Sequence, residues 1–366
     1  MSKHNSKIRR LFAWSLVFCF SFTGCYHSKD ESIRIFWENE RPRGILIPVS
    51  LVESSNENSF DMDIAVTIEG RANNPHILGY YSVEGQDVIF KPLLPLTHGL
   101  RYSVHYRNKF LGTIQVPNPD PSKAPFIVTV YPGEDTVPEN LLKLYIQFSS
   151  PMQEGGWKEK ITLLKNGTDT VRDAFLDEDL ELWNRDRTIL TIWFDPGRLK
   201  RGLQPNEKLG SPLQSAQRYE VIVSEKWRDI NGTNLTQDFH KKFYTIGRDS
   251  LSPNINTWVI QTPKAGTSDS LMVEFGEAMD AMLLLNSVWL VYKGNPVFAN
   301  VTRGEKERKL FFVPRAPWVA GEYQLVANAK FEDLAGNNLN RLFDNPVDIA
   351  GKALNEPVYM KSFRIK

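Results

Sequence analysis

The chain has 366 residues, of which 41% are hydrophobic, 11% aromatic and 24% charged, and its formal net charge is +1. This composition is typical of folded globular domains and excludes a disordered or low-complexity chain. The near-neutral charge argues against nucleic acid as a partner, because such binding needs clustered positive charge.

Residues 1–24 have the layout of a secretory signal. Four basic side chains precede an apolar run over 11–22, which is too short for a stable membrane span. The pair Gly24-Cys25 then resembles the lipobox of bacterial lipoproteins, in which the cysteine is diacylated, for example with palmitate, and becomes the new N-terminus. This resemblance implies a lipid on Cys25 that anchors the mature protein to a membrane.

Removal of residues 1–24 has two consequences. Cys19 is lost and Cys25 carries the lipid, so no disulfide is expected, and the formal charge falls to about −3. In the tether, 25–32, the stretch Ser28-Lys29-Asp30-Glu31-Ser32 resembles the signal that sends lipoproteins of Bacteroidetes-type bacteria to the outer face of the outer membrane. We therefore predict a cell-surface protein, with a solvated tether and the periplasmic face as the alternative.

The region 33–120 has the pattern of an N-terminal β-sandwich. Short β-rich runs alternate with Pro, Gly, Asn and Asp, and no helix of usual length competes with them. The predicted strands are Ile33–Trp37, Ile45–Val52, Met62–Ile68, Val88–Lys91, Tyr102–Tyr106 and Thr113–Val116.

A repeat follows in the next two thirds of the chain. Each copy has an alternating strand that ends in Phe, a Met four residues later, and then a Tyr-led strand followed by a turn with Asp, Gly and Leu. The matching segments are 144–152 with 271–279, 219–223 with 323–327, and 229–235 with 333–339. Alternation predicts half-buried strands, and the Asn-Gly and Gly-Asn pairs predict positive φ in the turns.

Three tyrosines, Tyr102, Tyr219 and Tyr323, each begin a predicted strand, and a Leu stands six residues before each of the first two. This pattern predicts tyrosine corners, in which the hydroxyl bonds to the backbone a few residues upstream.

Together these residues carry a family likeness. The segments 132–152 and 219–235, with their counterparts 275–279 and 333–339, resemble bacterial Ig-like domains of the S-layer type. The resemblance implies an all-β chain of three tandem Ig-like or fibronectin-like β-sandwiches at 33–120, 125–247 and 254–366. It brings no catalytic residues, because such domains serve as spacer, adhesive or assembly modules. The first unit lacks the Asp-Gly-Leu turn.

The second copy is the longer one. It holds about 23 residues more between Phe148 and Tyr219 than the third holds between Phe275 and Tyr323. Possible ligand-binding residues in this insertion are Trp183, Asp177, Asp179 and Glu181. The carboxylates could hold Ca²⁺ and the indole could stack on a sugar, but a solvated acidic loop and a core Trp are the alternatives.

Recognisable catalytic motifs are absent from the sequence. It has no His-Glu-x-x-His, Gly-x-Ser-x-Gly or phosphate-binding Gly-Lys-Ser/Thr pattern, and its histidines are scattered. We therefore expect no enzyme, no metal and no cofactor. A hydrolase would require a pocket that gathers two or more acidic residues with a histidine.

The predicted function is presentation. A lipid-anchored envelope protein would display tandem Ig-like domains for protein interaction, adhesion or envelope assembly. The alternative is a carbohydrate-binding surface lipoprotein of a glycan-uptake system. The partners are thus the membrane and either a protein or a glycan, and the loop 340–357 is predicted at the distal tip of the third domain, before a last strand Val358–Ile365.

Overall fold

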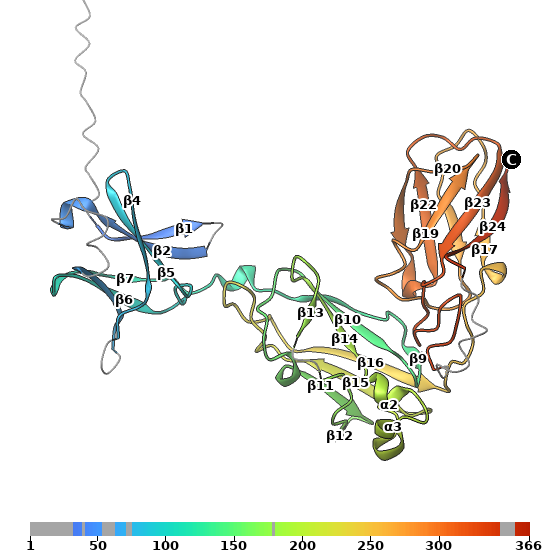
Figure 1. Ribbon diagram of the computed structural model, residues 1–366, viewed down its shortest axis with the longest axis horizontal. Helices are drawn as coiled ribbons and strands as arrows, with labels where there is room; N and C mark the ends of the chain where they lie inside the picture. Colours follow the sequence, from blue (N-terminus) through green and yellow to red (C-terminus); the bar gives the residue numbers. More distant parts are fainter. Residues whose placement is uncertain (1–31, 39–40, 53–62, 71–74, 178–179, 345–355) are drawn as a thin grey trace, which may run out of the picture. The chain divides into compact units, whose positions relative to one another are not determined.

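Strands form every layer of the fold (Figure 1). The computed structural model describes residues 32–38, 41–52, 63–70, 75–177, 180–344 and 356–366. Its α-helices are the short α2 (Pro196–Leu199) and α3 (Gln204–Leu209). Isolated 3-10 turns are Val49–Leu51, Pro121–Lys123, Trp157–Glu159, Ile255–Thr257 and Glu305–Glu307. The all-β prediction is confirmed, and no helix among the described residues is long and apolar enough to cross a membrane.

The chain divides into two compact units. The first comprises Met1–Leu96 with Leu100–Val116, and the second comprises Thr97–Gly99 with Pro117–Lys366. Cys25 and Asp179 lie outside the described residues, so the lipid anchor and this acidic ligand stay predictions.

The first unit is a sandwich of two antiparallel sheets, with the strand orders β1-β2-β5-β4 and β3-β6-β7. Its strands are β1 (Arg34–Glu38), β2 (Arg41–Pro48), β3 (Ile64–Ile68), β4 (Gly79–Glu84), β5 (Asp87–Pro92), β6 (Arg101–Tyr106) and β7 (Lys109–Gln115). Inward-facing side chains such as Ile45, Phe90 and Val104 are fully buried between the sheets. The predicted strands are present with shifts of a few residues. The edge strand β4 was missed, because its Gly-Tyr-Tyr-Ser-Val-Glu sequence does not alternate cleanly.

The second sandwich, in the second unit, has the sheets β13-β14-β10-β8 and β12-β11-β15-β16-β9. Its strands are β8 (Ile127–Tyr131), β9 (Thr136–Pro138), β10 (Lys143–Phe148), β11 (Ile161–Lys165), β12 (Asp169–Thr170), β13 (Leu182–Trp183), β14 (Ile189–Trp193), β15 (Arg218–Val223) and β16 (Phe239–Ile246). All pairs are antiparallel except β16 with β9. One apolar cluster fills the space between the sheets, with Trp227 and Phe194 at 0% exposure.

The third sandwich has the sheets β17-β18-β22-β21 and β20-β19-β23-β24. Its strands are β17 (Val259–Gln261), β18 (Leu271–Glu274), β19 (Val288–Tyr292), β20 (Asn295–Pro296), β21 (Ala299–Arg303), β22 (Lys309–Pro314), β23 (Gly321–Asn328) and β24 (Val358–Ile365). The last strand, β24, has the predicted bounds Val358–Ile365. Trp258, Phe275 and Phe331 pack edge to face in its core. The second and third sandwiches have separate cores within one compact unit, and the predicted domain boundaries remain predictions.

The repeated motifs occupy the same places in both sandwiches. Met152 forms an isolated β-bridge with Asp229, and Met279 forms the same bridge with Asp333. The turn glycines Gly232 and Gly336 have φ of 83° and 79°, as the turn chemistry predicted.

Two of the predicted tyrosine corners have hydroxyl groups bonded to nearby upstream backbone. The Tyr219 hydroxyl accepts a bond from the Gln214 N–H at 2.9 Å, and the Tyr323 hydroxyl donates to the Val319 carbonyl at 3.0 Å. Tyr102 is buried in the core of the first unit.

Candidate functional site

The second and third sandwiches meet at a joint that begins with main-chain contact. The N–H of Leu142 donates to the carbonyl of Leu334 at 2.9 Å, across the two sandwiches. Leu334 and Phe343 of the third sandwich pack against the core of the second. Gly336 also comes very close, since a Cβ there would lie 2.3 Å from a methyl carbon of Leu142. The apolar core of the second sandwich therefore extends into this part of the joint.

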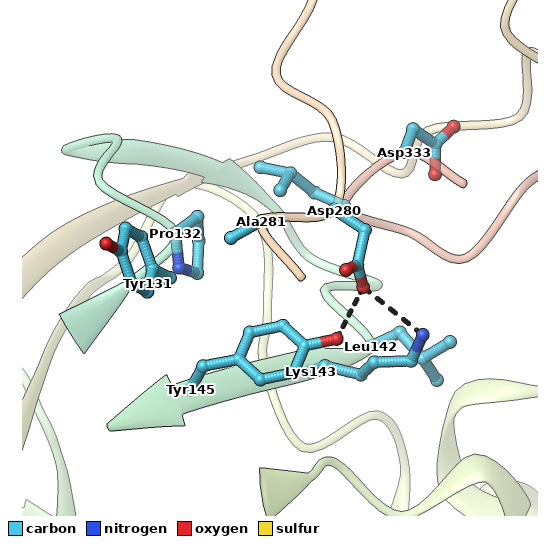
Figure 2. A pocket seen from close by; sticks show the side chains of 9 residues that line it. Tyr131, Pro132, Leu142, Lys143, Tyr145, Asp280, Ala281 and Asp333 are labelled. Atoms are coloured by element: carbon cyan, nitrogen blue, oxygen red, sulfur yellow. Dashed lines mark hydrogen bonds and ion pairs between the residues drawn. The ribbon is translucent and has the colours of Figure 1, made fainter. Parts of the chain in front are cut away.

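Buried charges lie beside this contact (Figure 2). Lys143 and Tyr145, on β10, both reach Asp280 of the third sandwich: the Lys143 Nζ is 3.2 Å and the Tyr145 hydroxyl 2.6 Å from Asp280 Oδ2. Lys143 also donates to Glu332 at 2.7 Å. The side chains of Lys143 and Asp280 are only 11% and 4% exposed. A buried ion pair of this kind depends on both partners, because either charge alone would be left without compensation.

The protonation of these groups follows from their burial. Desolvation by itself lowers the pKa of Lys143, but the charges of Asp280 and Glu332 outweigh it and raise the pKa above its ordinary value. Burial, and then the charge of Asp280, raise the pKa of the Tyr145 hydroxyl. Lys143 is therefore charged and Tyr145 is a neutral donor at physiological pH.

A second group of contacts joins the β8–β9 connection to the 3-10 turn at 305–307. The N–H of Gly133 donates to Glu307 Oε2 at 2.6 Å, and Glu134 pairs with Arg308. A Cβ at Gly133 would lie 3.1 Å from a Glu307 carboxylate oxygen, so the close approach favours glycine there. Burial raises the pKa of Glu307, and the bond from Gly133 opposes this rise.

An arginine adds a contact at the end of β8. The Arg303 guanidinium lies over the ring of Tyr131, 4.2 Å from its centre, and donates to the Tyr131 hydroxyl at 3.0 Å. This combines a cation–π interaction with a hydrogen bond, and both act across the joint.

The linker, the segment between β16 and the 3-10 turn Ile255–Thr257, is also held by hydrogen bonds. Asn140 and Asp249 exchange two hydrogen bonds of 2.9 Å, one from the Asn140 amide and one from the Asp249 N–H. Arg248 pairs with Asp344 at 3.0 Å and donates to the Leu199 carbonyl at 2.9 Å.

The longer connection of the second sandwich contributes to the joint. The segment between β14 and β15 carries α2 and α3, whereas the matching segment between β22 and β23 is a short loop. Just after α2, Arg201 donates to Asp344 at 2.9 Å and Lys200 lies over the ring of Phe343. The insertion therefore contacts the third sandwich, a role that its acidic and aromatic composition did not predict.

The described start of the loop predicted at the distal tip, residues 340–344, lies at this joint instead. Phe343 packs on the core of the second sandwich and Asp344 pairs with Arg248 and Arg201. The prediction was wrong because the strand order places the start of this loop beside the linker, at the opposite end from the tip. The rest of it, 345–355, lies outside the described residues.

Three carboxylates gather beside the joint. Asp249, Glu277 and Asp333 each offer an oxygen within 4.8 Å of the others. Burial, followed by the charge of Asp249, raises the pKa of Asp333 to about 8 and that of Glu277 to about 7. Such a group can share protons or contribute to a cation site, but three carboxylates would be only part of the six to eight oxygens that Ca²⁺ takes.

The residues predicted to bind a ligand lie elsewhere in the second sandwich. Trp183 is half-buried against Phe148 and Trp227, and its indole N–H donates to Glu181 at 2.7 Å. Asp177 is 85% exposed and pairs with Lys158. The structure thus brings Glu181 to Trp183 and places the indole in core packing, while ligand binding by these residues stays a prediction.

A small cleft beside Glu181 is lined by apolar side chains and Thr191, with no histidine among its described lining residues. Among its described lining residues, this cleft does not gather the two or more acidic residues and the histidine that a hydrolase would require.

Sequence reasoning missed the residues of the joint. The signal for Lys143 was its position within the apolar run Leu141-Leu142-Lys143-Leu144, where a charge needs a partner. Its partners Asp280 and Glu332 are 137 and 189 positions away, so no local pattern points to them.

Comparison with known proteins gives fold likeness only. No protein-family model and no curated protein matches the chain. Solved structures that resemble it include domains MG0-NIE-MG1 of native alpha-2-macroglobulin from Escherichia coli (11% identity, TM-score 0.23, covering 56% of this chain and 66% of that one). Another is the N-terminal part of the bacterial S-layer protein SbsC, with 10% identity and a TM-score of 0.24, covering 56% of this chain and 40% of that one. A third is a chimeric titin Z1Z2, with 10% identity and a TM-score of 0.22, covering 66% of this chain and 95% of that one.

The structural neighbours thus include an S-layer protein and Ig-like domains. This chain spans two-fifths of the S-layer structure that it matches and about two thirds of the macroglobulin structure. No activity is transferred from them.

Proposed function

We propose that the chain is a non-catalytic cell-envelope protein that is held in the outer membrane by a lipid on Cys25 and presents its tandem sandwiches to a protein partner at the cell surface. The observation that supports this proposal is the joint between the second and third sandwiches. Main-chain bonds, packed apolar side chains and buried ion pairs hold the two in one arrangement. A surface held in a fixed arrangement loses less entropy when a partner binds, which is what a presenting protein needs.

Acylation and exposure on cells test the anchor. Cells are fed tritiated palmitate while they express the parent chain, Cys25→Ala or the matched control Cys19→Ala. We expect label in the parent and in Cys19→Ala, none in Cys25→Ala, and digestion of the parent by protease added to intact cells. Label that persists in Cys25→Ala would contradict the anchor, and protection from protease until the outer membrane is broken would place the protein on the periplasmic face.

The stiffness of the joint is tested separately. Exposed Lys226 and Lys330, one on each sandwich, are replaced by spin-labelled cysteines in a Cys19→Ala, Cys25→Ala background, and the distance between the labels is measured by pulsed electron resonance. A single narrow distance distribution is expected, and it should broaden in Lys143→Met. A broad distribution in the parent would remove the argument for presentation by a rigid arm.

A carbohydrate-binding surface lipoprotein is the second candidate. A hollow on the outer face of the second sandwich favours it, and this hollow lies away from the predicted Trp183 cluster, on the other sheet.

A further inference from the structure

The five-stranded sheet of the second sandwich carries a hollow of about 740 Å³. This volume falls within the range that small-molecule and sugar sites occupy. The groups that matter for binding are Asp135, Asn166, Arg218, Glu220, Lys242 and Tyr244.

Strand alternation creates this arrangement. On β15 and β16, Tyr219 and Phe243 point into the core and stack with ring centres 5.7 Å apart. Their neighbours Arg218 and Tyr244 therefore lie on the outer face, directly opposite each other in the antiparallel register. These strands are adjacent in the middle of the sheet (Figure 1), so both residues project from a stiff part of the fold.

The acidic groups of the hollow already have partners. Glu220 accepts a hydrogen bond from His240 Nδ1 at 2.9 Å and lies 3.8 Å from the Lys242 Nζ. Asp135 accepts from Lys306 at 3.0 Å. Their negative charges are thus offset within the protein itself.

Arg218 and Tyr244 differ from these groups. Within the part of the chain that the structure describes, the Arg218 guanidinium and the Tyr244 hydroxyl make no hydrogen bond, and Arg218 has no ion pair. The Tyr244 side chain is 40% exposed, with its ring available to a ligand. Asn166 is held at the rim, because its Oδ1 accepts from the Arg218 main-chain N–H at 3.2 Å. The hollow therefore offers one uncompensated planar cation beside one exposed aromatic ring.

We infer that this hollow binds an acidic saccharide, with its carboxylate on Arg218 and the apolar face of its sugar ring on Tyr244. A guanidinium matches a carboxylate with two parallel hydrogen bonds. An exposed tyrosine supplies a flat apolar face with a polar edge, and the Glu220–Lys242 pair offers an acceptor and a donor to ring hydroxyls. The inference does not depend on the lipid anchor or on the rigid joint.

The test measures binding of trigalacturonic acid and of uncharged galactotriose to the full chain in detergent, by titration calorimetry. We expect the acidic trimer to bind at least about tenfold more tightly than the neutral one, since a hydrogen bond to a charged group contributes that much. Arg218→Gln should weaken binding of the acidic trimer about tenfold or more and bring it close to that of the neutral trimer. Tyr244→Thr, which keeps a strand-forming residue, should weaken both trimers about tenfold.

The matched control is Arg185→Gln, which removes an exposed arginine from the turn between β13 and β14, two strands of the opposite sheet, and should leave binding unchanged. Melting curves of each variant confirm that the fold is retained. Equal affinity for both trimers, equal losses in Arg185→Gln and Arg218→Gln, or no binding at millimolar concentration would each overturn the inference. Failure here leaves the palmitate and spin-label results unaffected.

Discussion

The turns that contain Asp229 and Asp333 have the same hydrogen-bonding pattern but different surroundings. In each, the aspartate Oδ1 accepts two main-chain N–H bonds: from Asn231 and Thr233 in the second sandwich, and from Ala335 and Asn337 in the third. The backbone geometry of the turn is thus the same. A short polar side chain that satisfies the turn's own N–H groups explains why the motif repeats.

The surroundings of the two turns differ. The position of Glu277 in the third sandwich is occupied by Ser150 in the second, and Asp249 of the linker joins only the Asp333 copy. Burial beside these carboxylates raises the pKa of Asp333 to about 8. The comparison teaches that the motif specifies a turn, whereas the carboxylates around it, from the third sandwich and the linker, decide its electrostatics.

The largest expected effect comes from removing the cation of the joint. Lys143→Met leaves Asp280 buried without its partner, so the free energy of unfolding of the second unit should fall by about 3 to 5 kcal/mol. Urea unfolding followed by tryptophan fluorescence measures it. The matched control is Ser270→Met, at the equivalent repeat position of the third sandwich, just before β18, which is exposed and should change stability by less than about 0.5 kcal/mol. Equal effects would show that the joint is not what stabilises the unit.

A smaller effect is expected from the paired turn glycines. Gly232→Ala should cost about 1 kcal/mol, because alanine is strained at positive φ but nothing lies within 4 Å of its Cβ. Gly336→Ala should cost about 3 kcal/mol, since its Cβ also meets Leu142 across the joint. Thermal and urea unfolding of both variants measure the difference. The same loss in both would mean that the two sandwiches separate readily in solution.

The third expected effect concerns pH. Glu277 and Asp333 have folded-state pKa values of about 7 and about 8, above the ordinary values of 4.5 and 3.8. The folded state therefore binds more protons than the unfolded state between about pH 4 and pH 8, so the free energy of unfolding should fall as pH rises through this window. Glu277→Gln should flatten this fall and be more stable than the parent at pH 8.

Unfolding midpoints at pH 5, 6, 7 and 8 measure this dependence. Glu225→Gln, at an exposed glutamate of the second sandwich, serves as the control and should keep the parent's slope. A stability that rises with pH would contradict the raised pKa values.

Several elements of the fold could be predicted because their signals are local. The alternation in Tyr219, Val221 and Val223 predicted β15, and the last strand, β24, has the predicted ends. The matched Asp and Gly positions predicted the turns, because positive φ is a property of single residues. The edge strand β4 was missed because edge strands carry weak alternation.

By itself, the sequence determined the all-β class, the repeat and its turn chemistry, since each depends on residues that are neighbours along the chain. Only the tertiary structure decided that the insertion and the loop around Phe343 build a joint, and that Arg218 and Tyr244 share one hollow. Lys143 meets Glu332 from 189 positions away, and such partners are defined only once two sandwiches have packed together. Long-range packing brings charges and rings into contact that no local periodicity encodes.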